Sequence, residues 1–163
     1  MTAAPQYPPF MFAYTCLGDI FAKIQAHDTP EVFSHDFLRF TLGFSRESDR
    51  AFIALAKRGG LLTTEGKPTD LYLRLRDPAQ TPAAVTVMMK QGFSMLYAKN
   101  ADVNDLDRKA VAAMLLELTG MEHGSPTVRA IVGTFFSLKA LASPPEVVER
   151  VANRRKATER RGR

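Results

Sequence analysis

The stretch from residue 44 to residue 78, FSRESDRAFIALAKRGGLLTTEGKPTDLYLRLRDP, constrains the fold of this chain more than any other part of it. Its first part places Phe52, Leu55 and Ala56 on one side of an ideal helix, and the pair Gly59-Gly60 ends that pattern. We expect this first part to be a helix whose outer face carries basic residues.

After the two glycines the hydrophobic period changes from that of a helix to that of a strand. Leu71, Leu73 and Leu75 alternate with polar or amphipathic residues. The sequence EGKPTD before them supplies a glycine for positive φ and a proline that presets φ, which is typical of a turn. We therefore expect a β-hairpin between Leu61 and Leu75.

Two shorter helices are predicted upstream of this stretch. Apolar residues recur at positions i, i+3, i+4 and i+7 over residues 17–26, and Ser34 is a suitable N-cap for a second helix over residues 33–42. Gly43 follows as a helix stop. Three helices joined by short turns and followed by a hairpin are typical of a winged helix-turn-helix unit.

The second half of the chain has helical patterns. We expect helices over residues 83–99 and 107–119, and a third that begins at Ser125-Pro126, an N-cap followed by a first-turn proline. The predicted fold is therefore mainly α. It consists of a winged helix-turn-helix-like half at residues 1–78, a helical half at residues 83–145 packed on it, and a basic tail at residues 146–163.

The apolar stripes of these helices predict the buried core. We expect the buried residues to include Phe21, Phe37, Leu38, Phe52, Leu55, Val111, Leu115, Ile131 and Phe135. We also expect Pro8 and Pro9 to lie in an extended arm across the core, with Phe10 and Phe12 as its anchors.

The charge of the chain is concentrated at one end. The formal net charge is +5, but residues 146–163 hold seven Arg or Lys against three Glu, so the rest of the chain is nearly neutral. The overall charge is therefore weak support for nucleic-acid binding. Evidence for such binding has to come from cations that lie close together in the nearly neutral part of the chain.

Locally, Arg46, Arg50 and Lys57 fall on one side of an ideal helix, opposite Phe52 and Leu55. Their side chains would meet phosphates or bases in a groove. Further cations are expected on the hairpin and in the tail, and the complete set of predicted nucleic-acid-binding residues is Arg46, Arg50, Lys57, Lys67, Arg74, Arg76, Arg154, Arg155 and Lys156.

This pattern favours a winged-helix protein that binds DNA or another nucleic acid. An alternative is a protein–protein interaction adaptor that uses the same scaffold without touching nucleic acid, because winged-helix units also serve as docking scaffolds. The nearly neutral body suits that use. A third interpretation is a solvated charged face that binds no partner.

The sequence gives no support for catalysis, a cofactor or a metal. GxSxG, P-loop and GxGxxG motifs are absent. The three histidines are far apart and lack HxxxH or HxxE spacing, and Cys16 is the only cysteine. We therefore expect a protein that is not an enzyme.

The same cysteine content, which excludes an intramolecular disulfide, fits the reducing cytosol, so we expect a cytoplasmic protein. The apolar run at residues 8–17 is broken by prolines and has no basic residue before it. It is therefore typical neither of a signal peptide nor of a membrane-spanning helix.

Several short motifs resemble a prokaryotic family known only as a domain of unknown function. They are YPPFMF at the start, LGFS followed by DRAF between Leu42 and Phe52, GKPTDLY at residues 66–72, and Thr134-Phe135. The resemblance extends to about Ala142, and GKPT is its most specific part. It implies a single intact module without the basic tail, and it brings no activity, substrate or cofactor.

Overall fold

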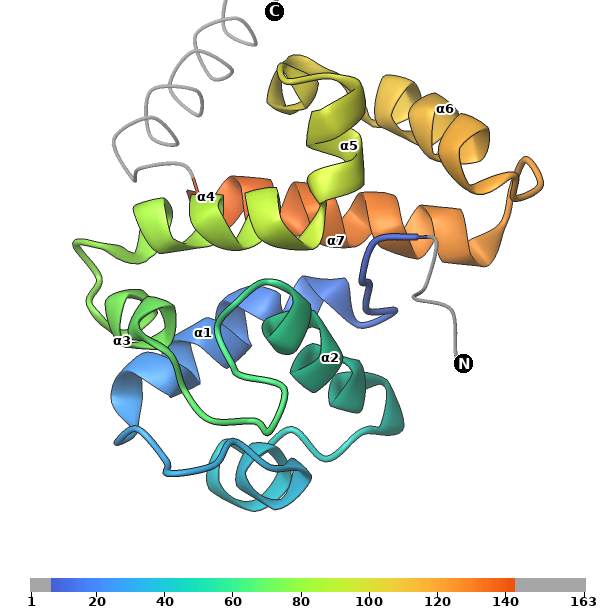
Figure 1. Ribbon diagram of the computed structural model, residues 1–163. Helices are drawn as coiled ribbons and strands as arrows, with labels where there is room; N and C mark the ends of the chain where they lie inside the picture. The colour runs from blue at the N-terminus through green and yellow to red at the C-terminus, as the bar shows by residue number, and fades with distance from the viewer. Residues whose placement is uncertain (1–6, 143–163) are drawn as a thin grey trace, which may run out of the picture.

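Two long helices, α4 (Thr81–Gly92) and α7 (Pro126–Ala142), lie side by side at the centre of the architecture (Figure 1). The structure is a computed structural model that describes residues 7–142. Figure 1 shows α5 and α6 on one side of this central pair and α1, α2 and α3 on the other. The described residues are helical or irregular throughout, so the mainly α prediction is confirmed.

Helix α7 is buried on most of its circumference. Its N-terminus is capped by Ser125, whose Oγ accepts a hydrogen bond from the Val128 N–H at 3.5 Å, and Pro126 occupies the first turn. Helices α4, α6 and α1 and the short helix η1 (Tyr14–Cys16) all contact it. The sequence of α7 is apolar or small at nearly every turn, and this allows neighbouring helices to cover it from several directions.

The N-terminal arm is fixed to α7 by the buried Thr134. The Met11 N–H donates to Thr134 Oγ1 at 3.0 Å, and Met11 is fully buried. Pro8 and Pro9 are also buried, as the arm prediction required. Phe12 is 60% exposed, so its prediction as an anchor is wrong, and Met11 fills that role.

Helix α1 (Leu17–Ala26) has the predicted bounds and buries its apolar stripe. The second predicted helix forms at residues 35–41 and contains a π-helical segment, η2 (Phe37–Thr41). Ser34 Oγ accepts a hydrogen bond from the Phe37 N–H at 3.1 Å, and Gly43 ends the segment with a φ of +86°. Figure 1 shows this helix at the edge farthest from the central pair.

The third predicted helix starts later than expected. It opens with a 3₁₀ turn, η3 (Glu47–Arg50), and continues as α2 (Ala51–Arg58). The predicted residues Phe52, Leu55 and Ala56 face the core. Gly59, directly after α2, lies against Gly92 of α4, with the Cβ position of Gly92 only 3.7 Å from the Gly59 Cα. A Cβ at Gly59 would clash with the Met88 side chain of α4, so it is Gly59 that lets the end of α2 approach α4 closely.

The predicted β-hairpin between Leu61 and Leu75 is wrong, and with it the winged helix. Among the described residues of this segment, the only β pairing is an isolated antiparallel bridge between Leu62 and Pro68. Beside it the Thr63 N–H donates to the Lys67 carbonyl at 2.8 Å. A turn follows the first arm as expected, but no second strand pairs with it.

The second arm is helix α3 (Asp70–Arg76). Leu71, Tyr72 and Leu75 are buried while Leu73 is 51% exposed, which is the i, i+1, i+4 spacing of a helix. The sequence LYLRLR fits either period, because leucine stands at both the strand-like and the helix-like positions. Burial of the large Tyr72 ring instead of Leu73 favours the helix.

The second half of the chain follows the predicted helices with one break. The helix expected over residues 83–99 is divided at Phe93 into α4 and α5 (Ser94–Lys99). A 3₁₀ turn, η4 (Val103–Asp105), leads to α6 (Arg108–Thr119). The Asp107 side chain caps α6 by accepting from the Ala110 N–H at 2.8 Å.

The buried apolar side chains of both halves form one continuous core. All of the predicted core residues are buried except Phe37, which is half-buried. Helix α4 contacts α2 and α3 as well as α7, so it joins the two halves. The predicted tail at residues 146–163 lies outside the described residues.

Candidate nucleic-acid interface

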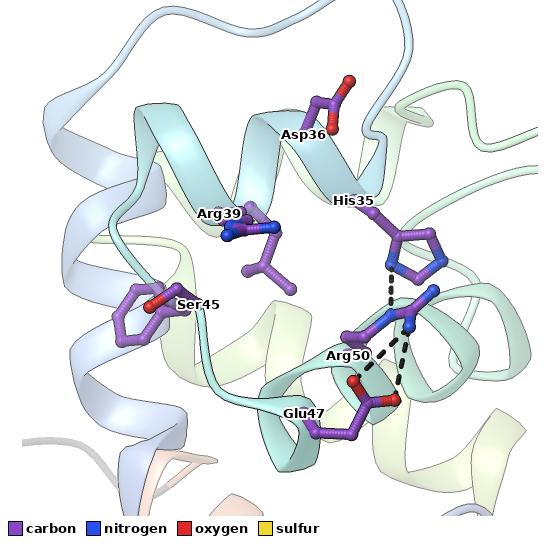
Figure 2. A pocket seen from close by; sticks show the side chains of 8 residues that line it. His35, Asp36, Arg39, Ser45, Glu47 and Arg50 are labelled. Atoms are coloured by element: carbon purple, nitrogen blue, oxygen red, sulfur yellow. Dashed lines mark hydrogen bonds and ion pairs between the residues drawn. The ribbon is translucent and has the colours of Figure 1, made fainter.

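The helix at residues 35–41, the turn after it and the 3₁₀ turn η3 form one surface, residues 35–50, which we call the basic edge after its three arginines; three carboxylates on the same segment balance their charge. It encloses a hollow of about 260 Å³ (Figure 2). Leu38, only 1% exposed, and the half-buried Phe44 give the hollow an apolar part. Its polar lining consists of His35, Asp36, Arg39, Ser45, Glu47 and Arg50.

Arg50 is held at one side of the hollow by two neighbours. Its Nη1 donates to the Glu47 carboxylate, at 3.2 Å to Oε1 and 3.5 Å to Oε2, and its Nε donates to His35 Nδ1 at 3.5 Å. Figure 2 shows the three side chains in a row. Because Nδ1 accepts a hydrogen bond here, this contact requires a neutral His35 imidazole. The Arg50 side chain remains 53% exposed.

Arg39 is the least engaged cation of the basic edge. It is exposed, and among residues 7–142 it makes no hydrogen bond or ion pair. Its guanidinium carbon lies 5.1 Å from the centre of the Phe40 ring, and that ring is 72% exposed. The stacking orients the guanidinium without using its N–H donors, so these donors are available to a ligand.

Arg46 does not join the row of cations predicted for the third helix, because it precedes that helix as its N-cap. Its N–H and guanidinium bind the buried Asp49, with Nη2 3.1 Å from Oδ1, and Nη2 also donates to Cys16 Sγ at 2.7 Å. Asp49, and after it Cys16, raises the pKa of Arg46. Arg46 therefore ties the start of η3 to the end of η1.

Lys57 and Lys67 are both exposed, and neither lines the hollow. Lys57 follows Arg50 by two turns of helix, which places both on one side of the third helix. Lys67 lies in the turn that precedes α3. That turn is fixed to the second helical segment because the Phe33 N–H donates to the Gly66 carbonyl at 2.8 Å.

The remaining predicted cations have other positions. Arg74 is exposed on α3, on an element separate from the basic edge. Arg76 is partly buried, and its Nη1 donates to Thr29 Oγ1 at 3.0 Å, so it fastens α3 to the loop after α1. Arg154, Arg155 and Lys156 lie outside the described residues.

The structure thus brings together Arg39, Arg50 and His35, and two of these were missed from the sequence. A helical wheel of residues 33–42 could have found Arg39, because it points away from the inward Phe37 and Leu38. His35 carried no such signal, since its role depends on the contact with Arg50.

Residues 7–142 contain no cluster of three His, Cys, Asp or Glu side chains that could hold a metal ion. None of the helices described there combines the length and apolar character needed to cross a bilayer.

Comparison with known proteins identifies the family. No curated protein matches the sequence, and no solved structure matches it. Residues 9–146 match a family described as a family of unknown function, DUF5343. This match covers most of the chain and confirms the resemblance drawn from its motifs, so the chain belongs to the DUF5343 family.

Proposed function

We propose that this protein binds nucleic acid through the basic edge. The observation that carries the proposal is the exposed Arg39 guanidinium, free of hydrogen bonds within residues 7–142, on the same hollow as the half-exposed Arg50. Planar guanidinium groups bind phosphate oxygens through paired N–H donors. Two of them at one hollow, with the Ser45 hydroxyl beside them, suit a phosphate of a nucleic-acid backbone.

In this proposal two exposed lysines outside the basic edge add further contacts to the bound strand. Lys57 lies on α2, and Lys67 lies in the turn before α3. Such contacts position a strand and make affinity depend on salt, without reading its sequence. In this proposal Arg154, Arg155 and Lys156 add attraction that does not depend on sequence, and the protein works in the cytoplasm as a binding protein with no catalytic step.

A protein partner is the second candidate, favoured by exposed apolar side chains. Phe40 is 72% exposed on the basic edge itself, and Leu73 is 51% exposed on α3. Large exposed aromatic residues are common in the centres of protein interfaces. We rank this candidate second because Phe40 already serves as the stacking partner of Arg39.

Fluorescence anisotropy with a labelled oligonucleotide tests the first proposal. The parent for this experiment is full length and carries Arg154→Gln, Arg155→Gln and Lys156→Gln, so that tail contacts do not mask the basic edge. Adding Arg39→Gln and Arg50→Gln should weaken binding. It should also flatten the plot of log affinity against log salt by roughly one unit for each phosphate that the variant no longer binds.

A matched control removes the same charge elsewhere. Lys90 on α4 and Lys109 on α6 are exposed, and replacing both by Gln should leave affinity and salt dependence close to the parent values. If the Arg39 and Arg50 variant binds as well as this control, the basic edge is not the interface. The protein-partner candidate then takes precedence.

A further inference from the structure

The apolar part of the hollow is more than a phosphate contact requires. Leu38 and Phe44 lie in the same lining as Arg39 and Arg50. Phosphate oxygens need donors and positive charge, and an apolar wall adds nothing to their binding. An aromatic wall beside cations is instead typical of sites that hold a base and its phosphate together.

The charges of the lining also argue against a bare polyanion. Arg39 and Arg50 are balanced by Glu47 and Asp36. A ligand that carries one negative charge together with hydrogen-bond donors fits such a lining better than a chain of phosphates. A nucleotide unit has both, because its phosphodiester is anionic and its base offers N–H groups to carboxylates.

The size of the hollow limits the ligand to one such unit. A volume of about 260 Å³ lies below the ~300–1,000 Å³ of pockets that enclose whole drug-sized ligands, so the hollow has room for part of one nucleotide and not for two. The neighbouring nucleotides of a strand must therefore remain outside the hollow.

A paired and stacked base cannot enter such a space. In a duplex the bases are stacked on each other, and only their edges reach the grooves. An unpaired base can leave its neighbours and stack on an aromatic side chain. We infer that the hollow receives one unpaired nucleotide of a single-stranded nucleic acid, with its phosphate on Arg39 and Arg50 and its base against Phe44.

This inference rests on the proposed function and has its own test. The full-length chain carrying Arg154→Gln, Arg155→Gln and Lys156→Gln, the parent of the experiment above, is titrated with a fluorescein-labelled 12-nucleotide single strand of DNA, the same sequence as RNA, and the same DNA as a blunt duplex. We expect at least about tenfold tighter binding of a single strand than of the duplex, since stacking on an aromatic residue accounts for a factor of this order. The DNA and RNA arms show which strand the site prefers.

The decisive variant is Phe44→Leu, which keeps an apolar side chain against the core but removes the aromatic face. It should weaken single-strand binding about five- to tenfold and leave duplex binding unchanged. The matched control is Phe12→Leu, because Phe12 is aromatic and exposed, lies on the N-terminal arm and does not line the hollow. That control should retain the preference for single strands.

A crosslink provides a readout on the unaltered protein. A single strand with 5-iodouracil in place of one thymine should crosslink to Phe44 on irradiation, within the tryptic peptide of residues 40–46, and fragmentation of that peptide separates a crosslink at Phe44 from one at Phe40. Equal affinity for duplex and single strand, or a crosslink confined to another peptide, overturns the inference while nucleic-acid binding stands. If the unaltered chain binds none of the three probes, the proposed function itself is refuted.

Discussion

The central pair of helices and the basic edge are built by different means. Helix α7 has 17 residues and buries eight of them, all but Thr134 apolar or glycine. By contrast, η2 and η3 have five and four residues and bury one each, Leu38 and Asp49. Packing holds the first region together, whereas side-chain hydrogen bonds to the backbone hold the second.

This difference explains where free polar groups occur. A long buried helix satisfies its backbone internally and has few polar side chains left for a ligand. The basic edge consists of a short π-helical segment, an irregular stretch and a 3₁₀ turn, and it exposes side chains that the fold does not use, Arg39 among them. Short, irregular helical segments on a rigid support are common positions for binding sites.

The largest expected effect tests the packed region. Phe135 on α7 is fully buried, and its ring contacts those of Phe93 and Tyr97. Phe135→Ala should lower the free energy of unfolding by about 3–5 kcal/mol, because it removes buried surface and leaves a cavity. Phe40→Ala, at a 72% exposed position on the basic edge, should change it by less than about 0.5 kcal/mol. If urea denaturation shows a similar loss of unfolding free energy for both variants, the two regions do not differ in how much packing contributes to them.

A second effect tests the core beneath the basic edge. Tyr72 is 1% exposed and its ring contacts that of Phe33, directly before the second helix. Burial raises the pKa of Tyr72 to about 12, so the folded state holds this proton more tightly than the unfolded state does.

Stability should therefore be constant below pH about 10 and fall between pH about 10 and about 12, by about 2–3 kcal/mol in total. The measurement is the denaturation midpoint as a function of pH. Tyr72→Phe should remove most of this alkaline decline. A decline of the same size in that variant would place its origin elsewhere.

A smaller effect tests the hydrogen bonds of the basic edge. Asp49 is 1% exposed and accepts from the Arg46 N–H and guanidinium. Asp49→Ala should cost about 1–2 kcal/mol, because it removes the cap of η3. Glu47→Ala, two residues away and 87% exposed, serves as the control and should have little effect on stability. An unchanged melting temperature for Asp49→Ala would mean that packing also holds this region.

The smallest effect concerns Arg50. Its ion pair with Glu47 joins two exposed side chains, so Arg50→Gln should change the free energy of unfolding by less than about 0.5 kcal/mol. The same substitution should weaken nucleic-acid binding. A large loss of stability would show that Arg50 is structural and would remove it from the proposed site.

Much of the packed region could be predicted from the sequence, and less of the basic edge. Helix α1 and the buried stripes of α2, α6 and α7 follow from a helical period that the structure keeps. The strand prediction for residues 71–75 fails because the leucines there fit two periods, and tertiary packing around Tyr72 decides between them.

The candidate site was only partly predictable, for a related reason. A helical wheel that starts at Ser45 assumes α-helix throughout. The third helix instead begins as a 3₁₀ turn after Arg46, so Arg46 does not share a helix face with Arg50 and Lys57. The pairing of His35 with Arg50 joins residues from two elements, and no local pattern encodes it. The sequence did identify Arg50 and Lys57 as exposed, and the structure agrees.

The bond between Met11 and Thr134 has a consequence for how the protein is made. A ribosome releases the N-terminal arm first, yet the partner that fixes it belongs to α7, among the last described residues. Helix α1 and η1 likewise contact α7. During synthesis the early helices therefore emerge with an incomplete core, and their apolar faces stay exposed until α7 leaves the ribosome and completes the fold.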